Sequence, residues 1–123
     1  GDVALFACGL MVGEALKAAE ILEEKGIFAA VINASSLKPL DEATTTAYAQ
    51  KCGAIVTAEE HSVIGGLGAA IAECLALHQP CPMEFVGVED RFGQSGRPDE
   101  LLEAYGLTAA HIVEKAKAAM ARK

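Results

Sequence analysis

The sequence predicts an α/β fold in which a mainly parallel β-sheet is covered by helices on both faces. Three observations predict it. Four short apolar runs read as strands, and the first of them, at residues 3–8, lacks alternation, which indicates a strand buried on both faces. Segments with helical spacing or helix-capping residues separate these runs. The runs begin near residues 3, 27, 53 and 83, a spacing that demands right-handed crossovers between parallel strands.

The first expected strand is VALFAC at residues 3–8, which Gly9 ends. The following segment, MVGEALKAAEILEEKG, has the spacing of an amphipathic helix, and Gly26 predicts its C-terminal stop. The second expected strand is IFAAVIN at residues 27–33. The apolar residues expected on one face of this helix are Val12, Ala15, Leu16, Ala19 and Leu22.

The middle of the chain repeats the alternation of helix and strand. Asp41 is a good N-cap for the helix EATTTAYAQK, and Lys51 suits the negative end of that helix. A third strand, GAIVTAE, is expected at 53–59, followed by a helix from about 67 to 77. After the proline-punctuated loop QPCP, the fourth strand is MEFVGV at 83–88.

The remainder of the sequence reads as a loop and two helices. The stretch EDRFGQSGR leads into a short helix, with Pro98 at its first position and Gly106 at its end. Thr108 is expected to cap a last helix. That helix would present Ile112, Ala116 and Ala119 on one face.

Composition limits the function classes. The chain has 123 residues, 52% apolar and 22% charged, which fits one globular domain spanning 1–123. A net charge of −7 argues against binding nucleic acid or an anionic membrane. No apolar run approaches the roughly 20 residues of a membrane span, and no signal peptide is visible. The abrupt start on an apolar strand suggests a piece of something longer.

The four cysteines lie at positions 8, 52, 74 and 81 among apolar or small neighbours. None forms a C-x-x-C pair, so a zinc or thioredoxin-type site is not expected. They read as reduced thiols that serve as small hydrophobes, which points to the cytoplasm. The three histidines have no metal-ligand spacing, and His78 and His111 are expected on helix surfaces.

The stretch EEHSVIGGLG follows the third strand, where open parallel sheets usually bind ligands. Backbone N–H groups near Gly65, Gly66 and Gly68 would suit an anion, although the G-x-G-x-x-G and P-loop spacings are absent. The preferred interpretation is a turn whose glycines let the next helix approach the sheet or another chain. Glu60 and His61 fit a hydrogen-bonded loop better than a general base, since no nucleophile is paired with the histidine.

A second polar cluster follows the fourth strand, in EDRFGQSGR at 89–97. Asp90 and Arg91 are able to pair with each other or with a partner, and Phe92 in its glycine-flanked loop is a candidate interface anchor. A solvated loop with a tucked phenylalanine is the alternative. Neither cluster makes a catalytic centre, which favours a domain that serves a larger assembly.

An ordered set of segments covering essentially the whole chain resembles the C-terminal domain of the transketolase family. The opening strand and helix, DVALFACGLMVGEALKAAEILEEKGI, carry the resemblance first. The turn Lys38-Pro39-Leu40-Asp41 follows within VINASSLKPLDEATTTAYAQKCGAIVTAEEH. The segments GGLGAAIAECL and GVEDRFGQSGRPDELLEAYGLTAAHIVEKA complete it. The closest likeness is to transketolase, including the split form with a separate C-terminal polypeptide.

The resemblance implies a Rossmann-like three-layer sandwich with four parallel strands and one antiparallel strand, whose position the sequence does not give. It implies a thiamine diphosphate-dependent transferase that moves a two-carbon ketol unit between sugar phosphates. The cofactor, its divalent metal, the activating glutamate and the G-D-G motif belong to other domains. This chain alone is expected to have no catalytic, cofactor-binding or metal-binding residues. Its expected partners are the N-terminal transketolase domains or subunit, with homodimer contacts.

Three alternatives remain open from the sequence. The chain resembles, more distantly, the corresponding domain of deoxyxylulose-phosphate synthase. The β subunits of 2-oxo-acid dehydrogenases share the fold as well. An independent anion-binding regulatory module, using the helix start at 65–68, would belong to a different functional class.

Overall fold

The computed structural model describes residues 1–34, 41–62, 66–88 and 108–123, without the side chains of 60–62 and 88. Four strands alternate with helices along the chain. The strands are β1 (Val3–Ala7), β2 (Ala29–Asn33), β3 (Ile55–Ser62) and β4 (Met83–Val88). The helices are α1 (Met11–Glu24), α2 (Glu42–Cys52), α3 (Leu67–His78) and α5 (Ala109–Ala121).

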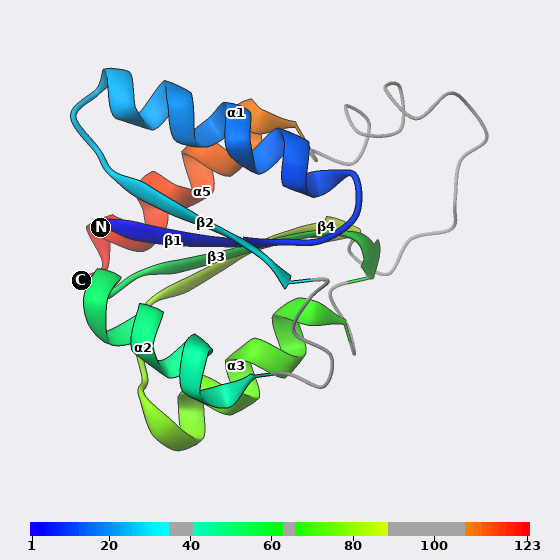
Figure 1. Ribbon diagram of the computed structural model, residues 1–123, viewed down its shortest axis with the longest axis vertical. Helices are drawn as coiled ribbons and strands as arrows, with labels where there is room; N and C mark the ends of the chain where they lie inside the picture. Colours follow the sequence, from blue (N-terminus) through cyan, green and yellow to red (C-terminus); the bar gives the residue numbers. More distant parts are fainter. Residues whose placement is uncertain (35–40, 63–65, 89–107) are drawn as a thin grey trace.

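The four strands form one sheet in the order β2-β1-β3-β4, and every neighbouring pair is parallel. Helices α1 and α5 cover one face and α2 and α3 the other, which gives three layers (Figure 1). The predicted α/β class is therefore confirmed. The described residues contain no antiparallel strand, and the stretch 89–107, with its predicted short helix, lies outside them.

The sheet separates two apolar cores because successive side chains of a strand point to opposite faces. The core under α1 and α5 contains Val3, Leu5 and Val56, all fully buried. The core under α2 and α3 contains Phe6, Ile55 and Ile71. This explains why the strands read as largely apolar runs.

The buried face of α1 differs from the predicted one. Its fully buried residues are Met11, Ala15, Ala18 and Leu22, whereas Val12 and Ala19 are half-buried and Leu16 is 53% exposed. The apolar stripe of this helix is wider than the core requires, so periodicity alone did not show which part faces inward. On α5, the predicted face of Ile112, Ala116 and Ala119 is fully buried.

The predicted stop of α1 is confirmed at Gly26, which has φ +77°. Its N–H donates to the Glu23 carbonyl, and the N–H of Ile27 donates to the Leu22 carbonyl, both at 2.9 Å. This pair of bonds is the Schellman motif, which needs a left-handed residue and therefore favours glycine.

Two predicted N-caps have different outcomes. Asp41 caps α2 as predicted, because its carboxylate accepts from the Thr44 N–H at 3.0 Å. Thr108 occupies the N-cap position of α5, but its hydroxyl lies 2.7 Å from Nδ1 of His111 and makes no capping bond. The N–H of Ala109 donates instead to Glu14 on α1, at 3.0 Å. A side chain 95 residues away therefore replaces the local cap.

The Asp41 cap predicts a pH-dependent contribution to stability. The Thr44 backbone N–H, and then its hydroxyl, lower the pKa of Asp41 below its ordinary value. A lowered folded-state pKa gives stability that is present above the unfolded value and is lost as pH falls through the folded one. Asp41→Ala is therefore expected to lower the urea midpoint at pH 7, and the difference from wild type should narrow below about pH 4.

Asp41→Asn is the matched control, because asparagine also caps helices but does not titrate. Its urea midpoint should stay closer to wild type than that of the alanine variant at pH 7. A difference between wild type and Asp41→Ala that is the same at pH 7 and pH 3 would contradict this account.

Within the described residues, none of the helices combines the length and apolar character needed to cross a membrane. The two chain ends lie close together (Figure 1). Nζ of Lys123 donates to the Asp2 carbonyl at 2.7 Å, and the Asp2 carboxylate accepts from the Phe28 N–H at 2.8 Å. Hydrogen bonds therefore join the start of β1, the start of β2 and the end of the chain, at the end of the sheet where the strands begin.

Candidate functional site

The candidate site lies at the carboxyl end of β3, where the chain passes into α3. In the described structure β3 continues to Ser62, so Glu60 and His61 belong to the strand rather than to a loop after it. Between Ala58 and Ser62, β3 advances four residues while β4 advances two, which marks a β-bulge. Bulges of this kind redirect side chains near the end of a sheet.

Glu59, within this irregularity, is a buried carboxylate with defined partners. It is only 1% exposed. One oxygen accepts from the N–H of Leu67 at 2.9 Å, and the other accepts from the N–H of Gly68 at 2.8 Å. A carboxylate is favoured there because unsatisfied N–H groups and the positive end of the dipole meet at a helix N-terminus. Glu59 therefore replaces the side-chain cap that Gly66 cannot provide.

The two N–H groups that would hold an external anion are thus satisfied within the chain. An incoming phosphate at Leu67 and Gly68 would have to displace a buried carboxylate of the same charge sign. The sequence did not predict these two hydrogen bonds.

Gly68 confirms the predicted close approach of helix and sheet. A Cβ added there would lie 2.6 Å from Cδ1 of Phe85 and 2.8 Å from Oγ1 of Thr57. Both distances are shorter than real Cβ contacts. The Thr57 hydroxyl is buried and has no hydrogen-bond partner among the described residues. Only glycine therefore fits at this position with the sheet in its present place.

The remaining predicted site residues are only partly described. The backbones of Glu60 and His61 are in β3, and Gly66 is the N-cap residue of α3. Glu59, Gly66 and Gly68 are brought together in the strand-to-helix turn. Gly65 and the whole second cluster, with Asp90, Arg91 and Phe92, lie outside the described residues.

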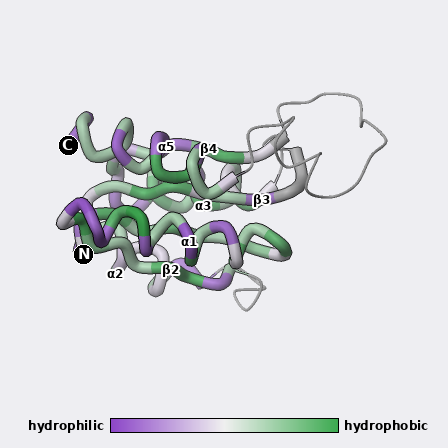
Figure 2. The backbone as a smooth tube through the Cα atoms, turned by 90° about the horizontal axis from the view of Figure 1, so that it is seen from above, coloured by the Kyte–Doolittle hydropathy of each residue, from purple (hydrophilic) through white to green (hydrophobic). Residues whose placement is uncertain are grey.

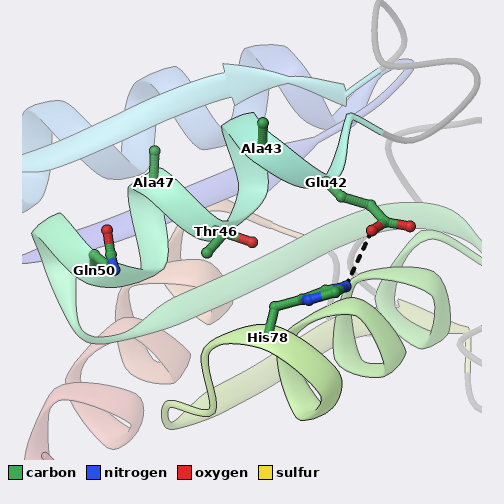
Figure 3. Close-up of a pocket in the computed structure, with 6 residues that line it drawn as sticks. All are labelled: Glu42, Ala43, Thr46, Ala47, Gln50 and His78. Carbon is green, nitrogen blue, oxygen red and sulfur yellow. Dashed lines mark ion pairs between the residues drawn. The ribbon is translucent and has the colours of Figure 1, made fainter.

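A shallow groove of about 460 Å³ lies between α2 and α3 (Figure 3). Nε2 of His78 is 3.1 Å from Oε2 of Glu42 across it, and both side chains are largely exposed. An exposed pair of this kind contributes little to stability. The predicted surface position of His78 is confirmed. The lining residues are Glu42, Ala43, Thr46, Ala47, Gln50 and His78, and they include no thiol or serine nucleophile.

The cysteines behave as the sequence suggests. No disulfide joins the four, all of which are described. Burial raises the pKa of the Cys74 thiol and of the Cys81 thiol, which favours their protonated form. Within the described ranges, no three histidine, cysteine or acidic side chains form a group that could hold a metal ion.

A sequence model of the family described as "Transketolase, C-terminal domain" matches residues 1–112. The chain belongs to this family. The resemblance found in the sequence segments is thereby confirmed. The matched residues include Glu59 and Gly68, so the strand-to-helix turn is part of the transketolase C-terminal domain.

Two curated relatives refine the assignment. The chain is 52% identical, over its full length, to the 6-deoxy-6-sulfo-D-fructose transketolase subunit SqwH of Clostridium sp. (strain MSTE9), of which it covers 38%. It is 44% identical over 117 residues to the 1-deoxy-D-xylulose-5-phosphate synthase of Heliobacterium modesticaldum (strain ATCC 51547 / Ice1), of which it covers 18%. The chain thus spans well under half of the length of either relative.

A solved structure gives the same result. A split-gene transketolase, described as an inactive β4 tetramer, superimposes with a TM-score of 0.94 at 50% identity. The match covers 99% of this chain and 40% of that one. The transketolase C-terminal domain described here therefore corresponds to less than half of that polypeptide.

Proposed function

We propose that residues 1–123 form the C-terminal domain of a transketolase, a transferase that moves a two-carbon ketol unit between sugar phosphates. The domain supports contacts with other domains and subunits and does not catalyse the reaction alone. The observation that carries the proposal is the 52% identity, across every residue of the chain, to a transketolase subunit. The structural likeness to a split-gene transketolase agrees with it.

The described residues do not fit the family's cofactor. Thiamine diphosphate needs an anion-binding site and a divalent metal. The free donors expected at the start of α3 are bonded to Glu59, and no metal-holding group of side chains is present in the described part of the chain. We therefore assign thiamine diphosphate and its metal to other domains of the parent enzyme, and derive no catalytic step in this chain.

In this proposal the turn between β3 and α3 has a structural role, and its surface contacts a neighbouring domain or subunit. Its described glycines, Gly66 and Gly68, permit the close approach, while Glu59 fixes the start of α3. We assign Glu60, His61 and Gly65 to the contact with a neighbouring domain or subunit. The same role is proposed for Asp90, Arg91 and Phe92. Homodimer formation and a cytoplasmic location complete the proposal, the latter supported by the absence of disulfides among the four cysteines.

Activity measurements on the parent enzyme and on the 123-residue chain test this function. The parent, with its N-terminal domains or subunit, thiamine diphosphate and Mg²⁺, is expected to transfer a two-carbon unit from a ketose donor to an aldose phosphate acceptor. The 123-residue chain under the same conditions is expected to show no turnover above background. Turnover by the chain alone, or none by the complete parent with any ketose donor, would contradict the proposal.

The donor set should include both fructose 6-phosphate and 6-deoxy-6-sulfo-D-fructose, since the relative named SqwH is described by the second sugar. A second candidate function is supported by the 44% identity to 1-deoxy-D-xylulose-5-phosphate synthase. Formation of 1-deoxy-D-xylulose 5-phosphate by the parent, without ketol transfer, would favour it. Co-purification with a lipoyl-carrying partner would instead favour a 2-oxo-acid dehydrogenase β subunit.

A further inference from the structure

The side of the molecule at β2 presents apolar residues that this domain leaves exposed or only half-buried. Val12, Leu16 and Ala19 are spaced four and three residues apart, so they form one stripe along α1. Leu16 is 53% exposed, and the other two are half-buried. Ala29 and Val31 of β2, also half-buried, pack against the same core as this helix. These five residues are called the β2 flank below.

Helix geometry places this stripe on the outer side of α1. Glu14, which contacts the start of α5, projects about 160° around the helix axis from Leu16, at 100° per residue. Helix α5 lies toward β4 and α1 toward β2 (Figure 2). The stripe therefore faces away from α5, beyond the outer edge of the sheet. This location also explains why a stripe predicted as core is partly exposed here.

The edge strand itself lacks the features that protect exposed edges. Among the described residues, no strand pairs with the outer side of β2. Its sequence, AAVIN, has no proline and no charged residue. Its register with β1 runs without a bulge from Ala29 to Asn33. Exposed edges are normally blunted by charges, proline or bulges, and an edge without them is usually covered.

Phe28, immediately before β2, adds an exposed aromatic group near the same edge. Its side chain is 64% exposed. Its backbone is held on both sides, because its N–H donates to the Asp2 carboxylate at 2.8 Å and its carbonyl accepts from the Asp2 N–H at 2.7 Å. Because the backbone is already held, burial of this ring by a partner would fix only its side-chain torsions.

We infer that the β2 flank and Phe28 form the docking surface for the preceding part of the same subunit, an inference that rests on the proposed function. Relatives contain a further 60% or so of chain beyond the matched region, since the match covers 38% and 40% of them. The family is a C-terminal domain, so that remainder precedes it. It would join at residue 1, which lies beside Phe28 through the Asp2 bonds. Tethering favours a contact at this surface over one with a free partner.

Hydrogen exchange and light scattering on the complete parent subunit test the inference. Leu16→Glu and Phe28→Glu place a charge on the docking surface, and Leu77→Glu is the matched control because Leu77 is 73% exposed on α3, in the opposite layer. The two surface variants should exchange the amides of residues 28–31 at least tenfold faster than wild type, with the oligomeric mass unchanged. The control should exchange them at the wild-type rate.

Equal exchange in all three variants would overturn the inference. A fall in oligomeric mass for Leu16→Glu or Phe28→Glu would also overturn it, since the surface would then belong to a second copy of the chain. Both measurements are made without substrate. Absence of ketol transfer by the wild-type parent would refute the proposed function. The hydrogen-exchange result would still show whether the docking surface is covered.

Discussion

Replacing Glu59 by alanine should lower the free energy of unfolding by about 3 kcal/mol, because two N–H donors at the start of α3 lose their acceptor in a buried place. The bonds are charge-assisted and lie at the positive end of a helix dipole, so each is stronger than a bond between neutral groups. For a chain of this length, the melting temperature should fall by roughly 10 °C.

Glu59→Gln removes the negative charge of this side chain while keeping nearly the same size and shape. The amide oxygen is able to accept from one N–H, but the amide nitrogen would face the other, so a loss of about 2 kcal/mol is expected. Glu73→Gln is the control, because Glu73 is an exposed residue of the same helix, and its effect should stay within about 0.5 kcal/mol. Denaturant unfolding of all three variants at pH 7 measures these differences.

Two results would contradict the role given to Glu59. The first is a Glu59→Gln variant as stable as wild type, which would mean that the carboxylate contributes no more than a neutral group. The second is a Glu73→Gln variant as unstable as Glu59→Ala, which would point to a general sensitivity of α3. Faster amide exchange at Leu67 and Gly68 in Glu59→Ala would place the loss at the helix start.

Local sequence signals predicted the elements of this fold well. Gly26 and Asp41 were identified because a helix stop and a helix cap depend on residues within one turn of the chain. The apolar runs predicted all four strands because the strands of a parallel sheet covered on both faces are mostly apolar. The fourth strand was placed at its observed bounds, whereas β3 continues through the bulge to Ser62.

Contacts between distant residues were not predictable in this way. Glu14 caps α5 across 95 residues of sequence. Glu59 caps α3 from the preceding strand, nine residues before Gly68. Nothing in the spacing of a single carboxylate shows which helix end it will reach. The width of the apolar stripe on α1 was visible, but its division between core and flank depends on where α5 packs. The interface roles of Asp90, Arg91 and Phe92 stay predictions.

The second large effect is expected from Gly68→Ala. Alanine is the better helix former by about 1 kcal/mol, so a glycine in a helix normally gains stability from this change. Here the new methyl group would overlap Phe85 and the buried Thr57 hydroxyl, at 2.6 and 2.8 Å. Overpacking of this kind costs about 1–3 kcal/mol, from which the propensity gain of about 1 kcal/mol is subtracted. A net destabilisation of about 1 kcal/mol is therefore expected in denaturant unfolding.

Gly13→Ala is the matched control, since Gly13 lies in α1 and an added Cβ meets nothing within 4 Å. It should stabilise the chain by about 0.5–1 kcal/mol, so the two glycine replacements should differ in sign. A double-mutant cycle with Phe85→Ala then identifies the clash. The double variant should be less destabilised than the sum of the single changes by about 1 kcal/mol, since Phe85 is the nearest obstructing atom group. Strict additivity, or a stabilising Gly68→Ala, would mean that α3 is free to move off the sheet.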